Sequence, residues 1–345
     1  MGREGWIMFQ GFSGVWTPVL LAGRIRDLPV AMHLAGERIV LFRDQDGQIG
    51  TLIDRCPHRG VALSRGRLTP EGRIECPFHG WQFDRLGNNC HVPLNPDAKR
   101  DTLSALALPT RVIADLVWVF TATGPHVSEP CVPDGLSAPG LARTYVQRTW
   151  RCHWTRAMEN MLDSPHLPFV HRRSIGKTLR QQMTPQSRME ISWEDTDFGG
   201  RTKARLDGQD GGAFLEYYKP NVMALHIPVP GKHLRIHALV IPEQNDSTRI
   251  IICQSRDFAR ARPLNLIFSW MNSRIADEDQ DVVESAGTSE VPPAASEKSV
   301  ATDRATLHFR KYYYSQLRES CSAPHPGGAM DSPPALLAQP SSDDR

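Results

Sequence analysis

Alternating apolar and polar positions predict strands in the first third of the chain. Residues 38–54, RIVLFRDQDGQIGTLID, run into an Asp-Gly turn and out again, a pattern typical of a β-hairpin. Residues 116–120, LVWVF, predict a buried strand. Loops rich in Gly, Pro and Cys separate these segments. We therefore predict a small β domain over about 35–125 that holds something in its loops. Whether residues 6–34 pack on a second domain or at its boundary stays open.

The remainder of the chain predicts a second domain of strands and helices. A Pro-, Gly- and Ser-rich linker or long loop at 124–140 precedes it. The pattern then predicts a helix near 155–163, strands from 187 to 257, and helices over 263–284 and 301–319. In the helix predicted over 263–284, an apolar face is expected through Leu264, Phe268, Met271 and Ile275.

Together these elements predict an α+β fold with two domains. We expect an all-β domain over residues 6–125 and an antiparallel sheet with helices over 140–320. The last residues, 322–345, are rich in Pro, Ser and Ala and are expected to be disordered.

Composition narrows the class of protein. A chain of 345 residues with 40% hydrophobic and 23% charged residues is typical of a soluble globular protein with two domains. The net charge of +2 gives no reason to expect nucleic acid. We find no apolar run long enough to span a membrane and no signal peptide, so the default location is the cytoplasm.

Two of the seven cysteines lie in matching contexts with histidine. The loops are Cys56-Pro-His58-Arg-Gly and Cys76-Pro-Phe-His79-Gly, so each offers one thiolate and one imidazole. A structural Cys₂His₂ zinc site is one interpretation. The mixed pair on each loop, the shared Cys-Pro and the Gly after the Cys-His segment favour a [2Fe–2S] cluster. An odd cysteine count without an export signal argues against a disulfide framework.

These loops, in the context CPHRG…LSRGRL…CPFHGW, resemble the Rieske domain of Rieske non-haem iron oxygenases. The resemblance implies that Cys56 and Cys76 bind one iron of the cluster and His58 and His79 the other. It also implies a helix-grip type of catalytic domain after the Rieske domain.

A second group of polar residues follows near residues 160–171. Asp163, His166 and His171 offer a carboxylate and two imidazoles, the set found in facial triads of non-haem iron enzymes. On a helix Asp163 and His166 would share one face, although Pro165 and Pro168 should distort or end a helix here. The H-E-x-x-H pattern of many zinc hydrolases is absent.

This segment resembles the iron-binding segment of the Rieske oxygenase catalytic domain. The resemblance implies His166 and His171 as iron ligands and Asp163 as a bridge that hydrogen-bonds a ligand histidine of each centre. In the family that bridge crosses between subunits, which implies a head-to-tail homotrimer. Asn160 matches a polar position near the iron.

The third ligand is expected from the acidic segment 275–284. Extending the apolar face predicted through Met271 and Ile275 by four residues reaches Asp279, and Glu278 borders the same face. The family pattern Glu-Asp-x-x-Val-Val-Glu also selects Asp279. Glu278 remains an alternative ligand, and a solvated acidic helix end remains an alternative interpretation.

The resemblance implies the terminal oxygenase of a multicomponent system. An NAD(P)H-dependent reductase, with or without a ferredoxin, would supply electrons, because the chain has no nucleotide-binding Gly fingerprint of its own. We expect hydroxylation, demethylation or desaturation of a ring-containing substrate. Phe169, Met223, Leu225 and Trp270 lie on segments expected to surround the iron, with an ordinary place in the core as the favoured alternative for each. The alternatives are a cis-dihydroxylating dioxygenase, a Rieske electron-transfer protein without catalytic iron, and a zinc-stabilised binding module.

Overall fold

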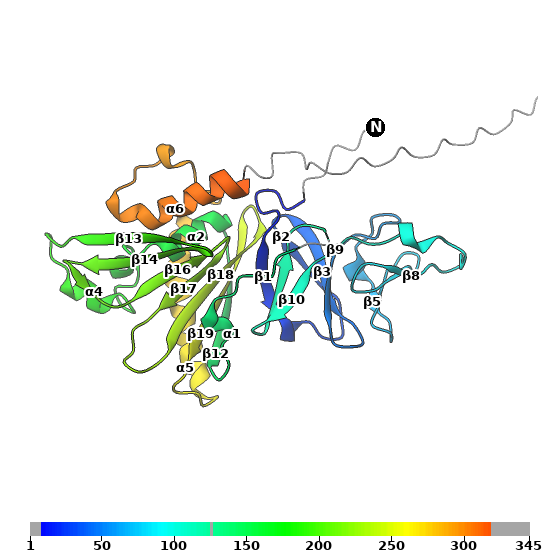
Figure 1. Cartoon of the computed structure of the whole chain (residues 1–345), viewed down its shortest axis with the longest axis horizontal. Helices are drawn as coiled ribbons and strands as arrows, with labels where there is room; N and C mark the ends of the chain where they lie inside the picture. Colours follow the sequence, from blue (N-terminus) through cyan, green and yellow to red (C-terminus); the bar gives the residue numbers. More distant parts are fainter. Residues whose placement is uncertain (1–7, 125–126, 319–345) are drawn as a thin grey trace, which may run out of the picture.

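Two β-rich units lie side by side in the computed structural model, which describes residues 8–124 and 127–318 (Figure 1). The first is all-β, and the second is a large antiparallel sheet packed against helices. The predicted α+β class is therefore confirmed. The predicted disordered tail, 322–345, lies outside the described residues.

Three small sheets build the first unit. The predicted hairpin is present as two antiparallel strands, and the segment 116–120 is a strand paired on both sides. One sheet contains β1 (Trp16–Leu21), β11 (Leu116–Phe120) and β10 (Thr110–Ile113), and another contains β2 (Val30–Leu34), β3 (Glu37–Arg43), β4 (Ile49–Ile53) and β9 (Ala107–Leu108).

The third small sheet carries the predicted cluster loops. It stands at the end of the molecule away from the large sheet (Figure 1). Its four short strands are β5 (Arg67–Leu68), β6 (Ile74–Glu75), β7 (Gln82–Phe83) and β8 (Asn89–His91).

Eight strands form the sheet of the second unit. Its longest antiparallel pairs join β12 to β19 and β18 to β19, and successive residues of the two central strands β18 and β19 are buried, so both of their faces are covered. In spatial order the strands are β12 (Ala142–Trp150), β19 (Ser247–Arg256), β18 (Leu234–Gln244), β17 (Val222–His226), β16 (Phe214–Tyr218), β14 (Gly199–Leu206) and β13 (Met189–Thr196), with β15 (Gln209–Asp210) paired to β14.

Three helices cover this sheet. Helix α5 packs on β12, α2 on β18 and α6 on β13. Their bounds are α2 (Trp154–Leu162), α5 (Leu264–Ser285) and α6 (Arg304–Tyr312), and the short helices are α1 (Asp134–Ser137), α3 (Leu167–Val170) and α4 (Lys177–Gln182). Within the described residues no helix is long and apolar enough to cross a bilayer.

Helix α5 confirms part of the face predicted for it. Asp279 is buried, Ile275 lines a cavity beside it, and the ring of Phe268 lies against the buried Arg256. Met271 was predicted wrongly, since it is 43% exposed. The other buried positions are Asn272, Ala276 and Val283, so the inward face is turned slightly from the predicted one.

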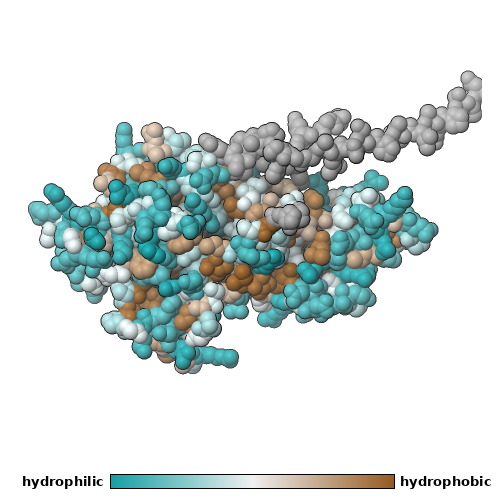
Figure 2. All heavy atoms as spheres, in the orientation of Figure 1, coloured by the Kyte–Doolittle hydropathy of each residue, from teal (hydrophilic) through white to brown (hydrophobic). Residues whose placement is uncertain are grey.

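The sequence left open where residues 6–34 pack. The described part of this stretch, residues 8–34, joins the two units. The described part of this stretch contributes β1 and β2 to the first unit, yet Phe12 packs against Trp154 of the second, with 5.1 Å between ring centroids. The amide of Ala35 donates to the carbonyl of Pro242 at 2.8 Å. Apolar surface on the face in Figure 2 gathers near the middle, over this junction.

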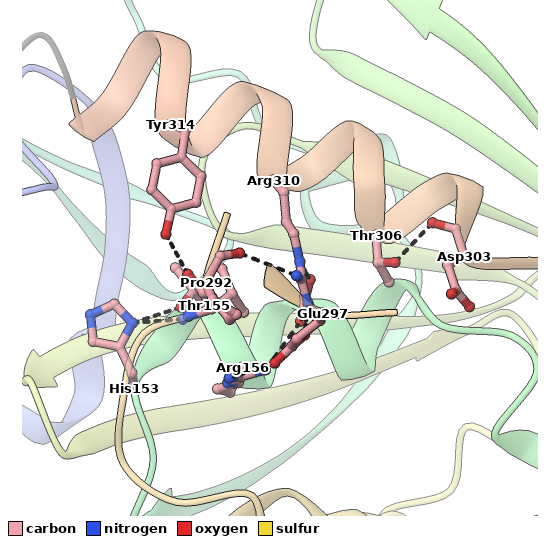
Figure 3. Close-up of polar contacts among 11 residues, drawn as sticks. His153, Thr155, Arg156, Pro292, Glu297, Asp303, Thr306, Arg310 and Tyr314 are labelled. Carbon is pink, nitrogen blue, oxygen red and sulfur yellow. Dashed lines mark hydrogen bonds and ion pairs between the residues drawn. The ribbon is translucent and has the colours of Figure 1, made fainter. Parts of the chain in front are cut away.

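A buried ionic network fastens α6 to α2 (Figure 3). Arg310, whose side chain is 9% exposed, donates to Glu159 of α2 at 3.0 Å and to Glu297 at 2.6 Å. Arg156 of α2 donates to the second oxygen of Glu297 at 3.1 Å. This network holds the helix that leads into the predicted iron-binding segment.

Candidate functional site

The two cluster loops share one backbone conformation. The amide of Gly60 donates to the carbonyl of Cys56 at 2.9 Å, and that of Gly80 to the carbonyl of Cys76 at 3.0 Å. Both glycines have positive φ, +73° and +69°, which glycine adopts without strain. A Cβ at Gly80 would also lie 3.0 Å from Cγ of Pro93. The glycine in each loop therefore permits the tight return that brings Cys and His together.

The four side chains on these loops converge. Cys56 and Cys76 are each 2% exposed, and the rings of His58 and His79 lie 4.6 Å apart between centroids. Trp81 stacks on His58 at 4.6 Å. Nδ1 of His58 is buried and receives no hydrogen bond. An unpartnered ring nitrogen beside two buried thiols fits a metal group that both loops share.

The four ligands are arranged as two like pairs. The thiols of Cys56 and Cys76 interact with each other, and the rings of His58 and His79 lie side by side. A tetrahedral zinc would require all four around one point. A two-iron cluster instead takes the ligands as two separated pairs. Burial, followed by the neighbouring Cys76, raises the pKa of Cys56 to about 11, so binding a metal must displace a proton.

The second group of predicted site residues, Asp163, His166 and His171, lies around the break between helices α2 and α3. Helix α2 ends at Leu162, because Pro165 disfavours a helical conformation in the residue before it. Asp163 is extended, so it and His166 do not share a helix face as the spacing alone suggested. They still meet, with Oδ2 of Asp163 3.7 Å from Nδ1 of His166. His171 follows directly on the short helix α3.

His166, His171 and Asp279 come together from two distant segments. Their ligand atoms all lie within 4.8 Å of one another. Oδ1 of Asp279 is 3.0 Å from Nε2 of His171 and 3.5 Å from Nε2 of His166, yet it is buried and accepts no hydrogen bond. Two imidazole nitrogens and a carboxylate facing one point fit a single iron with open positions.

Glu278 lies on the side of the His171 ring opposite Asp279. Its Oε2 lies 2.9 Å from Nδ1 of His171 and accepts a hydrogen bond from Oγ of Ser174 at 2.6 Å. Burial alone would lower the pKa of His171, but the carboxylates of Asp279 and Glu278 outweigh it and raise that pKa. The surroundings therefore favour positive charge at this ring. Asp277 points away and pairs with Arg148.

A cavity of about 710 Å³ opens beside these three residues. Asn160 lines it, and its Nδ2 is buried without a hydrogen-bond partner. Met223 and Leu225 line it as predicted. Phe169 and Trp270 do not: they are 56% and 63% exposed, because they stand on the outer sides of their helices.

Sequence reasoning missed most of the cavity wall. The sheet side of the wall comes from strands that lie far apart along the chain. Their alternation predicted strands, but no local signal tells which apolar face encloses a cavity rather than solid core. The apolar and hydroxyl residues missed on these strands include Met189, Thr202, Ala204, Leu206, Phe214, Leu215, Ile236, Ala238 and Ile252.

Comparison with known families agrees with both halves of the fold. Residues 15–109 match the Rieske [2Fe-2S] domain, and residues 150–319 match the vanillate O-demethylase oxygenase C-terminal domain. The chain belongs to the Rieske oxygenase family. Its cofactors are accordingly a [2Fe–2S] cluster and a mononuclear iron.

Several individual proteins are similar to the chain. The 3-chlorobenzoate-3,4-dioxygenase oxygenase subunit of Comamonas testosteroni is 31% identical over 160 residues, 45% of this chain and 37% of that protein. Pheophorbide a oxygenase of Arabidopsis thaliana is 28% identical over 70% of this chain and 49% of its own length. The chain thus spans less than half the length of these relatives.

The fold also matches a solved structure. The crystal structure of dicamba monooxygenase bound to dicamba superposes with a TM-score of 0.75 at 21% identity. The match covers 90% of this chain and 98% of that one. At this identity the likeness shows that the two proteins share a fold.

Proposed function

We propose that this protein is the terminal oxygenase of a multicomponent Rieske system. The observation that carries the proposal is the convergence of His166, His171 and Asp279 beside a large cavity, in a chain that also has a Rieske domain. An electron-transfer protein without catalytic iron has no need for a buried carboxylate without a hydrogen-bond partner between two histidines.

Each metal has a proposed set of residues. Cys56, Cys76, His58 and His79 would hold the cluster, and His166, His171 and Asp279 the single iron. Bound there, the metals supply electron storage and O₂ activation, so the oxidising power belongs to them. Glu278 is proposed as the partner of His171 rather than as a ligand, because it faces the ring nitrogen opposite Asp279.

The chain's own residues position the ligands and the substrate. Nδ1 of His171 donates to Glu278, which leaves Nε2 free to bind metal. Asp163 stands beside Nδ1 of His166 and is 34% exposed, so its carboxylate also reaches the surface. We assign it the bridge between a cluster and an iron. Asn160 lines the cavity beside the iron residues.

The reaction proposed is hydroxylation, demethylation or desaturation of a ring-containing substrate. The match to the vanillate O-demethylase domain over 150–319 favours it, and the cavity volume suits a ring system. A cis-dihydroxylating dioxygenase is the second candidate, because two relatives are named as dioxygenase subunits. Incorporation of one or both atoms of ¹⁸O₂ into the product separates the two.

A head-to-tail homotrimer is proposed for the assembly. Exposed apolar side chains occur at both ends that such a contact would join: Phe78 in a cluster loop, and Phe169 and Trp270 near the iron residues, each more than half exposed. The two groups lie in different units of the chain (Figure 1). Light scattering should give a mass of three chains, and replacing Phe78 by Asp should reduce it.

The electron donors proposed are an NAD(P)H-dependent reductase and, where present, a ferredoxin. We place the system in the cytoplasm, where NAD(P)H is available. Several relatives carry chloroplast names, so cell fractionation is the deciding measurement.

The domain limits are also proposed, as 6–125 and 140–320. The matched family ranges fall inside them. Limited proteolysis with mass spectrometry should cut first between residues 125 and 140.

Metal analysis together with turnover tests the function. Anaerobically purified protein should contain about three irons and two sulfides per chain, and His171→Ala about two irons with the Rieske spectrum intact. With a surrogate reductase, only the unaltered protein should incorporate ¹⁸O into a substrate. Two irons in both proteins would favour the electron-transfer protein, and a colourless zinc protein the binding module.

A further inference from the structure

A short turn connects His171, a proposed iron ligand, to the wall of the cavity. It covers residues 172–176 and leads from the end of α3 into α4. The carbonyl of His171 accepts two backbone hydrogen bonds from this turn, at 2.9 Å from the amide of Ser174 and at 3.0 Å from that of Gly176. Beyond the turn, Leu179 and Gln182 of α4 line the cavity. The same few residues therefore contact His171 and lead into the cavity wall.

Helix α3 does not fix the place of His171 by itself. It spans only Leu167–Val170, a single turn, and His171 follows at its end. A helix this short is not stable alone, and the carbonyls at its end need partners from outside the helix. The amides of Ser174 and Gly176 supply these partners to His171. The position of its backbone thus depends on the turn that follows.

Gly176 lies too close to α3 to carry a side chain. An added Cβ would lie 2.0 Å from the carbonyl oxygen of Leu167 and 3.1 Å from that of His171. Both are backbone atoms, so neither can rotate away as the end of a side chain could. The φ of Gly176 is −85°, which every residue can adopt. Close contact, rather than an unusual backbone conformation, therefore requires glycine here.

Ser174 connects the same turn to Glu278 of α5. Its Oγ donates to Oε2 of Glu278 at 2.6 Å, and this oxygen is the one that lies 2.9 Å from Nδ1 of His171. Nε of Arg274 donates to the other oxygen of Glu278 at 3.3 Å. These bonds hold the carboxylate against the histidine ring. The turn thus fixes the backbone of His171 through Gly176 and its ring through Ser174 and Glu278.

We propose that Ser174 and Gly176 are positioning residues for His171 as a ligand of the iron. The inference rests on the proposed function, because it takes His171 as an iron ligand. Neither residue is a ligand itself. They act through the backbone of His171 and through Glu278, so replacing them should change the iron site of a protein that is otherwise folded.

A matched pair of glycine substitutions tests Gly176. Gly211 also lines the cavity, but a Cβ there meets no atom within 4 Å, and its φ is not positive. We expect Gly176→Ala to lower the affinity of the holoenzyme for Fe(II) about tenfold and Gly211→Ala to leave it unchanged. The iron retained at increasing chelator concentration gives the affinity, and circular dichroism shows that each variant is folded.

The geometry of the iron site gives a second readout that needs no turnover. With nitric oxide added to the reduced protein, the electron paramagnetic resonance spectrum of the bound Fe(II) reports the symmetry of its ligands. Gly176→Ala should alter this spectrum, whereas Gly211→Ala should reproduce that of the unaltered protein. A loss of stability alone would leave the spectrum of the folded fraction unchanged.

Replacing Ser174 tests the other half of the turn without adding a methyl group to a closed space. Ser174→Ala removes the hydroxyl that bonds Glu278 and should lower the affinity for Fe(II) severalfold. Ser174→Thr keeps a hydroxyl at the same position and should retain most of the affinity. Where Gly176→Ala does not fold, this second pair decides.

Three results would overturn the inference. They are an unchanged affinity and spectrum in folded Gly176→Ala or in Ser174→Ala, an equal loss of iron in Gly211→Ala, and a loss in Ser174→Thr as large as in Ser174→Ala. The proposed function fails by a different result. An unaltered protein without the third iron would overturn the function and the inference with it, whereas three irons in the unaltered protein and in every variant alike would overturn the inference alone.

Discussion

Glu278 holds His171 by the ring nitrogen that faces away from Asp279, with 2.9 Å between Oε2 and Nδ1. Glu278 and Asp279, which are adjacent on helix α5, thus lie against opposite nitrogens of the His171 ring. The bond to Glu278 fixes the tautomer, so the lone pair of Nε2 faces Asp279 and His166. Hydrogen positions are inferred from these partners.

Replacing Glu278 should therefore weaken iron binding without removing a ligand. We expect Glu278→Gln to lower iron affinity about tenfold or more, because the amide keeps the shape but loses the charge that supports His171. The fraction of iron that each protein retains at increasing chelator concentration measures this affinity. Asp277→Asn, a change at the neighbouring exposed acid that pairs with Arg148, is the control and should retain iron like the unaltered protein. Equal retention in both variants would contradict the assigned role of Glu278.

Replacing Asp163 should slow electron transfer between the two metal centres without removing either metal. Asp163→Asn should keep both metals but slow reoxidation of the reduced cluster by about tenfold or more, since its carboxylate lies beside His166 and reaches the surface. Stopped-flow absorbance after mixing with substrate and O₂ follows the cluster directly. A variant that reoxidises at the original rate with full iron content would rule out a bridging role.

The ionic network between α2 and α6 should stabilise the second domain. Glu159→Gln removes one carboxylate from the buried Arg310, leaving Glu297 as its anionic partner, and should lower the free energy of unfolding by about 1.5 kcal/mol. Urea titration of the unaltered and variant proteins measures the loss. The exposed pair of Arg148 and Asp277 provides the comparison, because Asp277→Asn should change stability by less than about 1 kcal/mol. Similar losses in both variants would contradict this account.

A buried histidine should make stability depend on pH. His237 is 0% exposed, and burial lowers its pKa from 6.5 to about 3. Below pH 6.5 the unfolded chain binds a proton at this residue that the folded protein does not, so stability falls with decreasing pH by up to about 1.4 kcal/mol per pH unit. This loss continues until the folded pKa is reached.

Comparing the free energy of unfolding at pH 7 and pH 5.5 tests the sign of this pH dependence. His237→Gln should lose stability overall yet fall less steeply between the two pH values than the unaltered protein. His91→Gln, at an exposed position, should keep the original slope. An unchanged slope in His237→Gln would show that the folded protein protonates this ring normally.

The cluster loops could be predicted from the sequence because their ligands are local. Each loop brings one Cys and one His together within five residues, and its glycine sets the backbone, so spacing alone carries the geometry. Strands such as 116–120 were predictable for a similar reason, since alternation and burial are local in the sequence. The face of α5 was predicted only in part: Asp279 faces inward as predicted, but Met271 is exposed, because an inward face is defined by what it packs against.

By itself, the sequence determined which metal ligands the chain carries and which family it resembles, because ligand spacing and turn residues act over a few neighbouring positions. Only the tertiary structure decided that Asp279 stands beside the two histidines while Glu278 takes the opposite nitrogen. It also decided which faces of the strands enclose the cavity. Both depend on contacts between segments a hundred or more residues apart, or on which face of a strand is enclosed, and no local pattern encodes either.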